Sequence, residues 1–182
     1  MNFLDDFRTS VLAGLSQEQK AIPCRFFYDQ QGSQLFSQIT SLEEYYPTRT
    51  EKEILLTQAA SLRAALPSGL SVVELGSGTS EKTPLLLSAL EHVAAYVPVD
   101  IVPDTLRDAA KMIEARFPSI PVVPVHADFT KPFTLPASVQ SPKLGFFPGS
   151  TIGNFTDREA EAFLSELATS LGAGSYLLVG AD

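Results

Sequence analysis

A glycine-containing turn is the part of this 182-residue sequence whose residue types and spacing point most directly to chemistry. The string ELGSGTSEKT at 74–83 follows the apolar run at 71–73 and precedes a stretch with a helical pattern. In an open α/β sheet, a turn of this kind after the first strand is where nucleotide-like ligands bind. We therefore expect a ligand site at this turn.

Three kinds of ligand compete for the turn, and one residue separates them. A dinucleotide site has a third glycine, and a phosphate-binding P-loop has its second glycine, at the position that Glu81 occupies here. A carboxylate at that position would repel phosphate oxygens. S-adenosylmethionine carries no phosphate, and its reactive centre is a cationic sulfonium, so it tolerates an acidic surrounding. The residues therefore favour S-adenosylmethionine over both phosphate ligands.

Two acidic residues at later strand ends support the same ligand. Asp100 closes the second apolar run, and Asp128 follows the third. An S-adenosylmethionine site is expected to have one acid for the ribose hydroxyls and another for the adenine amino group. Taken singly, Glu74, Asp100 and Asp128 are also explained as strand-end or capping carboxylates. Their register at successive strand ends favours the functional interpretation.

Short β-branched runs alternate with amphipathic helical patterns after Gly69, which is typical of a parallel sheet with helices on both faces. The spacing of apolar residues predicts strands at 71–75, 95–100, 122–127, 144–147 and 176–179, with helices at 81–91, 104–117 and 157–171. Thr156 and Glu159 form a capping-box pattern at the start of the last helix. Before Gly69, the pattern predicts helices at 3–15, 33–40 and 49–66. The expected fold is α/β and Rossmann-like, preceded by an N-terminal helical segment.

Composition excludes several classes of partner. The 13 Lys and Arg against 21 Asp and Glu give a net charge of −8, the wrong sign for nucleic acid. Cys24 is the single cysteine and only His92 and His126 accompany it, so we expect no disulfide, no metal site and a cytoplasmic location. No apolar stretch reaches the roughly 18 residues of a membrane span. The residues near Met1 do not resemble a secretion signal. We expect a monomer by default.

Six strings, in order from about Pro23 to Asp182, resemble one family. They are FYD at 27–29, EYYPTR at 44–49, ELGSGTSEKT at 74–83, VPVD at 97–100, ADF at 127–129 and GSTIGN at 149–154. In these strings the chain is similar to the histidine-specific, S-adenosylmethionine-dependent methyltransferases. This family includes the L-histidine Nα-methyltransferases of ergothioneine biosynthesis, which convert histidine to hercynine by three methylations. The resemblance implies the class I methyltransferase fold and S-adenosyl-L-methionine as cofactor.

The resemblance also implies roles for individual residues. Around the cofactor it places Tyr28, Gly76, Lys82, Asp100, Asp128 and Phe129. On the amino-acid substrate it places Tyr45 and Asn154, and the Tyr45 hydroxyl is our candidate for orienting the amine. From the residues alone, buried aromatics with a polar tip remain an alternative for both tyrosines, and Asn154 reads as a turn residue.

Two alternatives to a histidine methyltransferase stay open. Relatives of the family methylate other amino acids, including prenylated tryptophan, so the acceptor can differ. Full-length family members are longer, so the chain can also be a cofactor-binding fragment without turnover. We expect a helical segment at 1–68 that contributes to both ligand sites. The Rossmann-like core at 69–182 is then expected to lack its last strands at the C-terminus.

Overall fold

The structure is a computed structural model that describes residues 3–27 and 29–182, so the predicted cofactor residue Tyr28 lies outside the described residues. The chain divides into two compact units, Met1–Ser41 and Leu42–Asp182. The expected boundary between 68 and 69 rests on the change of element pattern and stays a prediction. Within the described residues, no helix is long and apolar enough to cross a bilayer.

The first unit contains helices, as its sequence pattern predicts. They are α1 (Phe3–Ser16), the 3-10 helix η1 (Cys24–Phe27) and α2 (Gln30–Ile39). Asp29 caps α2 by accepting a hydrogen bond from the backbone N–H of Gly32 at 2.7 Å. Arg25 of η1 pairs with Asp6 of α1 at 3.3 Å, and this ion pair ties the two elements together.

The second unit is built on a parallel sheet in the order β3-β2-β1-β4-β5. Its strands are β1 (Ser71–Leu75), β2 (Ala95–Asp100), β3 (Val125–His126), β4 (Lys143–Phe147) and β5 (Tyr176–Val179). The strand order reverses between β1 and β4, and the carboxyl ends of strands at such a reversal form the usual ligand crevice. The glycine turn follows β1 and therefore lies at this reversal.

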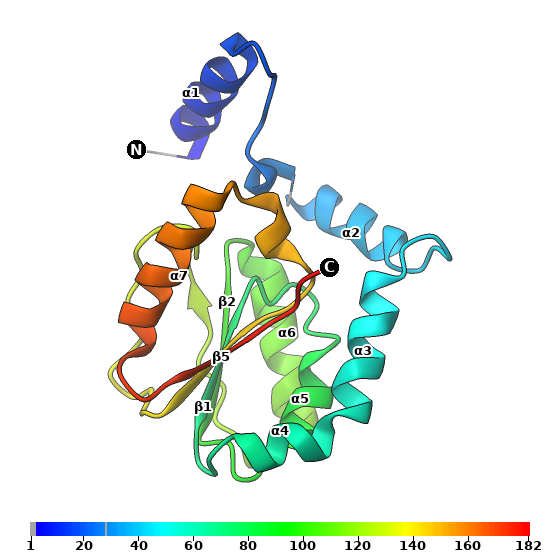
Figure 1. Ribbon diagram of the computed structural model, residues 1–182, viewed down its shortest axis with the longest axis vertical. Coiled ribbons are helices and arrows are strands. Elements are labelled where there is room, and N and C mark those ends of the chain that lie inside the picture. The colour runs from blue at the N-terminus through cyan, green and yellow to red at the C-terminus, as the bar shows by residue number, and fades with distance from the viewer. Residues whose placement is uncertain (1–2, 28) are drawn as a thin grey trace. The chain divides into compact units, whose positions relative to one another are not determined.

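Helices cover both faces of the sheet (Figure 1). The second unit contains the helices α3 (Pro47–Thr57), α4 (Ala59–Ala65), α5 (Thr83–Ala89), α6 (Pro103–Arg116) and α7 (Asp157–Leu171), and the 3-10 helix η2 (Thr151–Asn154). Leu55, Leu86 and Ile113 pack from α3, α5 and α6 against one face of the sheet. Phe163 and Leu167 of α7 pack against the other face. The predicted parallel α/β architecture is therefore confirmed.

Burial explains why the central strands form where they do. Every residue of β1, β2 and β4 is buried, as is expected for strands covered on both faces. β5 forms one edge of the described sheet and is more open, with Tyr176 and Leu177 exposed by 40% and 41%. The capping box of Thr156 and Glu159 is present at the start of α7, as predicted.

A predicted helix and a predicted strand differ from the structure in more than their end residues. The helix expected at 49–66 is two helices, because Gln58 leaves the helical conformation at φ −97° and ψ 10°. The strand expected at 122–127 is reduced to Val125–His126, with a separate bridge from Val122 to Tyr96. Pro124 interrupts it, since proline has no N–H to donate to the neighbouring strand.

Candidate functional site

The glycine turn after β1 has a backbone conformation that its glycines make possible. Gly76 has φ +66° and Gly78 has φ +49°. The N–H groups of Gly76 and Ser77 both donate to the carbonyl of Val99 on β2, at 2.9 and 3.2 Å. A Cβ atom on Gly76 would lie 3.1 Å from the Phe129 ring, so the turn and that ring are in close contact. Two predicted cofactor residues are thus neighbours.

Asp100 lies beside the same turn, at the end of β2. Its side chain is nearly buried and accepts a hydrogen bond from the Gly78 N–H at 2.8 Å and another from the Val102 N–H at 2.9 Å. A carboxylate has about four lone-pair positions, so these two bonds leave it able to accept from further donors. Asp100 therefore holds the turn in place and can still accept further hydrogen bonds at the carboxyl end of β2.

Asp128 and Phe129 follow β3 at the same edge. One oxygen of Asp128 accepts from the backbone N–H and the hydroxyl of Thr130, at 3.0 and 2.5 Å. The other oxygen is buried without a hydrogen bond and lies 3.3 Å from the Lys131 ammonium. The Phe129 ring meets Phe147 edge-on, with 5.5 Å between ring centroids. This packing fixes an aromatic face next to the acid.

A buried polar network lies beneath the turn. The Thr83 hydroxyl donates to the Glu74 carboxylate at 2.6 Å, and the Tyr96 hydroxyl donates to the same oxygen. The hydroxyls of Ser80 and Tyr96 are 2.9 Å apart. Burial raises the pKa of Glu74 from 4.5 to about 7, although both hydrogen bonds act in the opposite direction. Burial, followed by the charge of Glu74, raises the pKa of Tyr96 well above its usual range.

Lys82, the predicted cofactor residue at the N-cap of α5, has a partner that sequence reasoning missed. Its ammonium donates to the carboxylate of Glu51 on α3, and both side chains are mostly buried, with exposures of 15% and 17%. Glu51 also accepts from the backbone N–H of Gly149, at 3.0 Å to each oxygen. The pattern of EYYPTR followed by an acid could have drawn attention to Glu51, but nothing in the sequence identifies its partner.

Glu81, the residue that departs from the P-loop pattern, is held by Lys52. Their side chains are 2.7 Å apart and partly exposed. The positive charge of Lys52 offsets the repulsion that the Glu81 carboxylate would exert on a phosphate. The exclusion of a P-loop therefore depends more on the missing glycine than on the acid itself.

The predicted substrate residues are Tyr45, in the segment before α3, and Asn154, in η2 after β4. Tyr45 lies just before α3 and is half-buried. Burial, then the charges of Glu51 and Asp182, raise the pKa of its hydroxyl. Asn154 is the last residue of η2 and is exposed. The structure thus puts Tyr45 near the ion pair and leaves Asn154 on the surface after β4.

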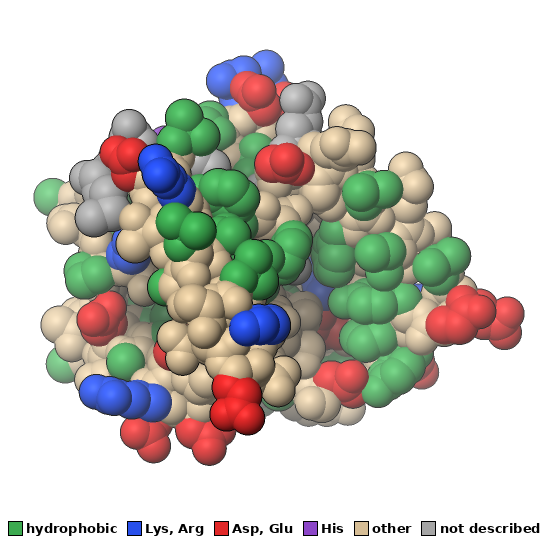
Figure 2. Space-filling view, turned by 90° about the horizontal axis from the view of Figure 1, so that it is seen from above, with side chains coloured by type: hydrophobic (Ala, Val, Ile, Leu, Met, Phe, Trp, Pro, Cys, Tyr) green, Lys and Arg blue, Asp and Glu red, His purple; other side chains and the backbone are tan. Residues whose placement is uncertain are grey.

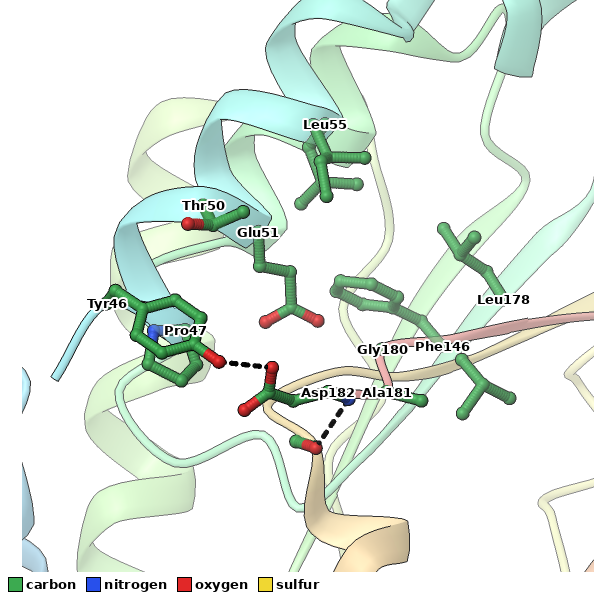
Figure 3. Close-up of a pocket in the computed structure, with 13 residues that line it drawn as sticks. Tyr46, Pro47, Thr50, Glu51, Leu55, Phe146, Leu178, Gly180, Ala181 and Asp182 are labelled. Atoms are coloured by element: carbon green, nitrogen blue, oxygen red, sulfur yellow. Dashed lines mark hydrogen bonds between the residues drawn. The ribbon is translucent and has the colours of Figure 1, made fainter.

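A cavity of about 180 Å³ lies between the start of α3 and the carboxyl ends of β4 and β5 (Figure 3). The Glu51 carboxylate points into it, and the Tyr46 hydroxyl donates to Asp182 at 2.6 Å across its mouth. The Asp182 N–H donates to the Ser150 hydroxyl at 2.9 Å. The rest of the lining is mostly apolar and comes from Pro47, Thr50, Ile54, Leu55, Phe146, Leu178, Val179, Gly180 and Ala181. An apolar cavity with two carboxylates suits a ligand with a cationic or amine group.

A solved structure with a similar fold is magnesium protoporphyrin IX methyltransferase from Synechocystis PCC 6803 with bound S-adenosylmethionine. It matches with a TM-score of 0.57 at 16% identity, over 80% of this chain and 69% of that one. At this identity, the likeness concerns the fold alone.

Two curated relatives are much closer in sequence. Histidine N-alpha-methyltransferase from Mycolicibacterium smegmatis is 45% identical over 96% of this chain. Histidine N-alpha-methyltransferase from Mycobacterium tuberculosis is 41% identical over 96% of the chain. The matched part spans 55% of the length of each relative.

A family model described as histidine-specific methyltransferase, SAM-dependent, matches residues 7–182. The match includes the glycine turn, the acids at the strand ends and the loop after β4. The chain therefore belongs to the histidine-specific, S-adenosylmethionine-dependent methyltransferase family.

Proposed function

We propose that this chain carries the S-adenosyl-L-methionine site of an N-methyltransferase that acts on the α-amine of L-histidine. Three successive methylations would give hercynine, in the route to ergothioneine. The observation that carries the proposal is the joining of Gly76, Asp100 and Phe129 around one turn, in a chain of the histidine-specific family. Family membership supports the acceptor class, and the geometry supports the cofactor.

The described residues fit the parts of this cofactor. The turn at Gly76 admits the amino-acid end close to the backbone, and Lys82 would receive its carboxylate. Asp100 has accepting capacity for ribose hydroxyls. Asp128 would accept from the adenine amino group, with Phe129 against the base. When bound, the cofactor supplies a methyl group on a cationic sulfur. Tyr28 keeps its predicted role as a cofactor residue and lies outside the described residues.

The protein's own contribution would be alignment of the two ligands and exclusion of water, which lowers the barrier without a covalent step on the chain. The α-amine must be neutral to attack. Tyr45 has a raised pKa, so its hydroxyl stays protonated near neutral pH and suits orienting the amine by a hydrogen bond better than removing its proton. Asn154 is proposed as a second contact of the substrate. The carboxylates of Glu51 and Asp182 favour an amine near Tyr45.

Surface charge is compatible with a small-molecule acceptor. On the face shown in Figure 2, Lys and Arg side chains are scattered among acidic ones and do not gather into a basic patch. With the net charge of −8, this supports an amino-acid substrate over nucleic acid. The expected cytoplasmic location and the monomeric state stay predictions.

Calorimetry and a methylation assay together test the proposal. The 182-residue chain should bind S-adenosylhomocysteine, and mass spectrometry should detect mono-, di- and trimethylated histidine when S-adenosylmethionine and histidine are added. A folded chain that binds neither S-adenosyl ligand would refute the site. Binding without turnover would favour the cofactor-binding fragment, and methylation of another amino acid in preference to histidine would favour the alternative acceptor.

A further inference from the structure

The carboxylate of Glu51 joins three segments that are far apart in the sequence. It comes from α3, accepts from the Lys82 ammonium at the start of α5, and accepts from the Gly149 N–H after β4. Both members of the ion pair are mostly buried, whereas other pairs such as Lys52 with Glu81 are much more exposed. A pair withdrawn from water is screened less by salt and held more tightly than a surface pair.

The backbone at the ends of β4 and β5 approaches the Glu51 carboxylate closely. A Cβ atom on Gly180 would lie 1.9 Å from the Oε1 atom of Glu51, so no other residue fits at position 180 unless the carboxylate moves. Gly149 has φ +84°, and its N–H points at both carboxylate oxygens, at 3.0 Å. The ends of β4 and β5 are thus shaped to receive this one side chain.

The contact has a consequence for Lys82. A lysine ammonium has three N–H donors on a flexible stem, and fixing such a stem costs rotamer entropy. Glu51 takes one donor and so selects one position of the ammonium before any ligand arrives. The two remaining donors can be offered to a ligand carboxylate without that ordering cost.

We infer that Glu51 is a positioning residue that acts through Lys82, presenting its ammonium to the carboxylate of the bound S-adenosyl ligand. The inference rests on the proposed function, because it requires that Lys82 receives that carboxylate. It assigns to α3, outside the Rossmann-like strands and helices, a part in binding the cofactor.

Two ligands that differ only in the amino-acid end separate this role from a structural one. S-adenosylhomocysteine has the carboxylate, and methylthioadenosine lacks it. Measured by calorimetry, Glu51→Gln should weaken the binding of S-adenosylhomocysteine by about tenfold, as expected for loss of a well-placed charged hydrogen bond. The affinity for methylthioadenosine should change less than about twofold. Glu53→Gln, an exposed acid on the same helix, is the matched control and should bind both ligands like the parent chain.

A double-mutant cycle tests whether the effect passes through Lys82. Adding Glu51→Gln to Lys82→Met should cost no further affinity for S-adenosylhomocysteine, because the group that Glu51 positions is already gone. Additive losses would overturn the inference. So would equal weakening of both ligands, or tighter binding by Glu51→Gln, which would mean that Glu51 competes for the ammonium. A parent chain that binds methylthioadenosine but not S-adenosylhomocysteine would refute the role of Lys82 and this inference, whereas failure to bind either would refute the proposed function itself.

Discussion

The Tyr96 hydroxyl on β2 donates a hydrogen bond to the Glu74 carboxylate on β1, and both side chains are buried beneath the glycine turn. Glu74 is 2% exposed, so its carboxylate is shielded from solvent. Its oxygen accepts from Thr83 at the start of α5 and from Tyr96, so the acid ties the turn to the second strand and to the following helix.

Glu74 should make stability depend on pH. Its pKa is raised from 4.5 to about 7 by burial, so the folded state holds the proton more strongly than the unfolded state does. The resulting stabilisation is complete below pH 4.5 and is lost as the pH rises through about 7. For this group the loss is roughly 3 kcal/mol. The free energy of unfolding in urea should be measured across this pH range for the parent chain and for Glu74→Gln. Relative to its own value at low pH, the parent should show the decrease and Glu74→Gln should not. Glu114→Gln, an exposed acid on α6, should keep the parent's dependence.

Asp100 should contribute to cofactor affinity beyond its role in the turn. Asp100→Ala is expected to weaken S-adenosylhomocysteine binding by about 2 kcal/mol, the size of a hydrogen bond to a charged group. Calorimetry measures the change, and circular dichroism checks that the variant is folded. Asp108→Asn, exposed on α6, serves as the control. Unchanged affinity in a folded Asp100→Ala variant would remove the ribose role from this residue.

Gly76→Ala should destabilise the chain for two reasons. Alanine is strained at φ +66°, and its Cβ would lie 3.1 Å from the Phe129 ring. Gly174→Ala is the matched comparison, since Gly174 has φ +76° with no atom within 4 Å of the added Cβ. The free energy of unfolding should fall further for Gly76→Ala than for Gly174→Ala, by about 1 kcal/mol. If the two variants lost equal free energy of unfolding in denaturant, the Phe129 ring would be able to move aside without cost.

The capping box of α7 should make a measurable contribution to the free energy of unfolding. The Thr156 hydroxyl accepts from the Glu159 N–H at 3.3 Å, and the Glu159 carboxylate accepts from the Thr156 N–H at 2.9 Å. Thr156→Ala should lower the free energy of unfolding by about 1 kcal/mol. Ser165→Ala, within the same helix and exposed, should not lower it, because alanine favours helix interiors. No loss in Thr156→Ala would mean that water replaces the cap without cost.

The fold was predictable where one local signal decided the outcome. β1 and β5 have their predicted bounds because their short apolar runs end at a glycine, and β2 has its predicted bounds because its apolar run ends at Asp100. The predicted helix at 81–91 is shorter, Thr83–Ala89, and has Pro84 in its first turn, where proline is favoured. Gln58 shows the limit of this reasoning. The apolar spacing of a helix continues across it, but the helical conformation of the backbone does not.

The arrangement of the candidate site was predictable in part, and the roles of its residues stay predictions. Gly76, Asp100 and Asp128 could be placed because parallel strands bring their carboxyl ends to one edge, a rule that needs only strand order. Glu51 could not, because its contact with Gly149 spans 98 positions of sequence and depends on how α3 packs against the sheet. An exposed acid on a helix and a buried one at the ligand edge look alike in the sequence.

The edge position of β5 in the described sheet should affect how the chain behaves at high concentration. Strand N–H and C=O groups at a sheet edge can pair with any extended segment that approaches them. Here Tyr176 and Leu177 add partly exposed apolar surface to that edge. Self-association through β5 would add its own heat to a ligand titration at calorimetric concentrations. A lysine on this edge strand, as in Leu177→Lys, should reduce such pairing.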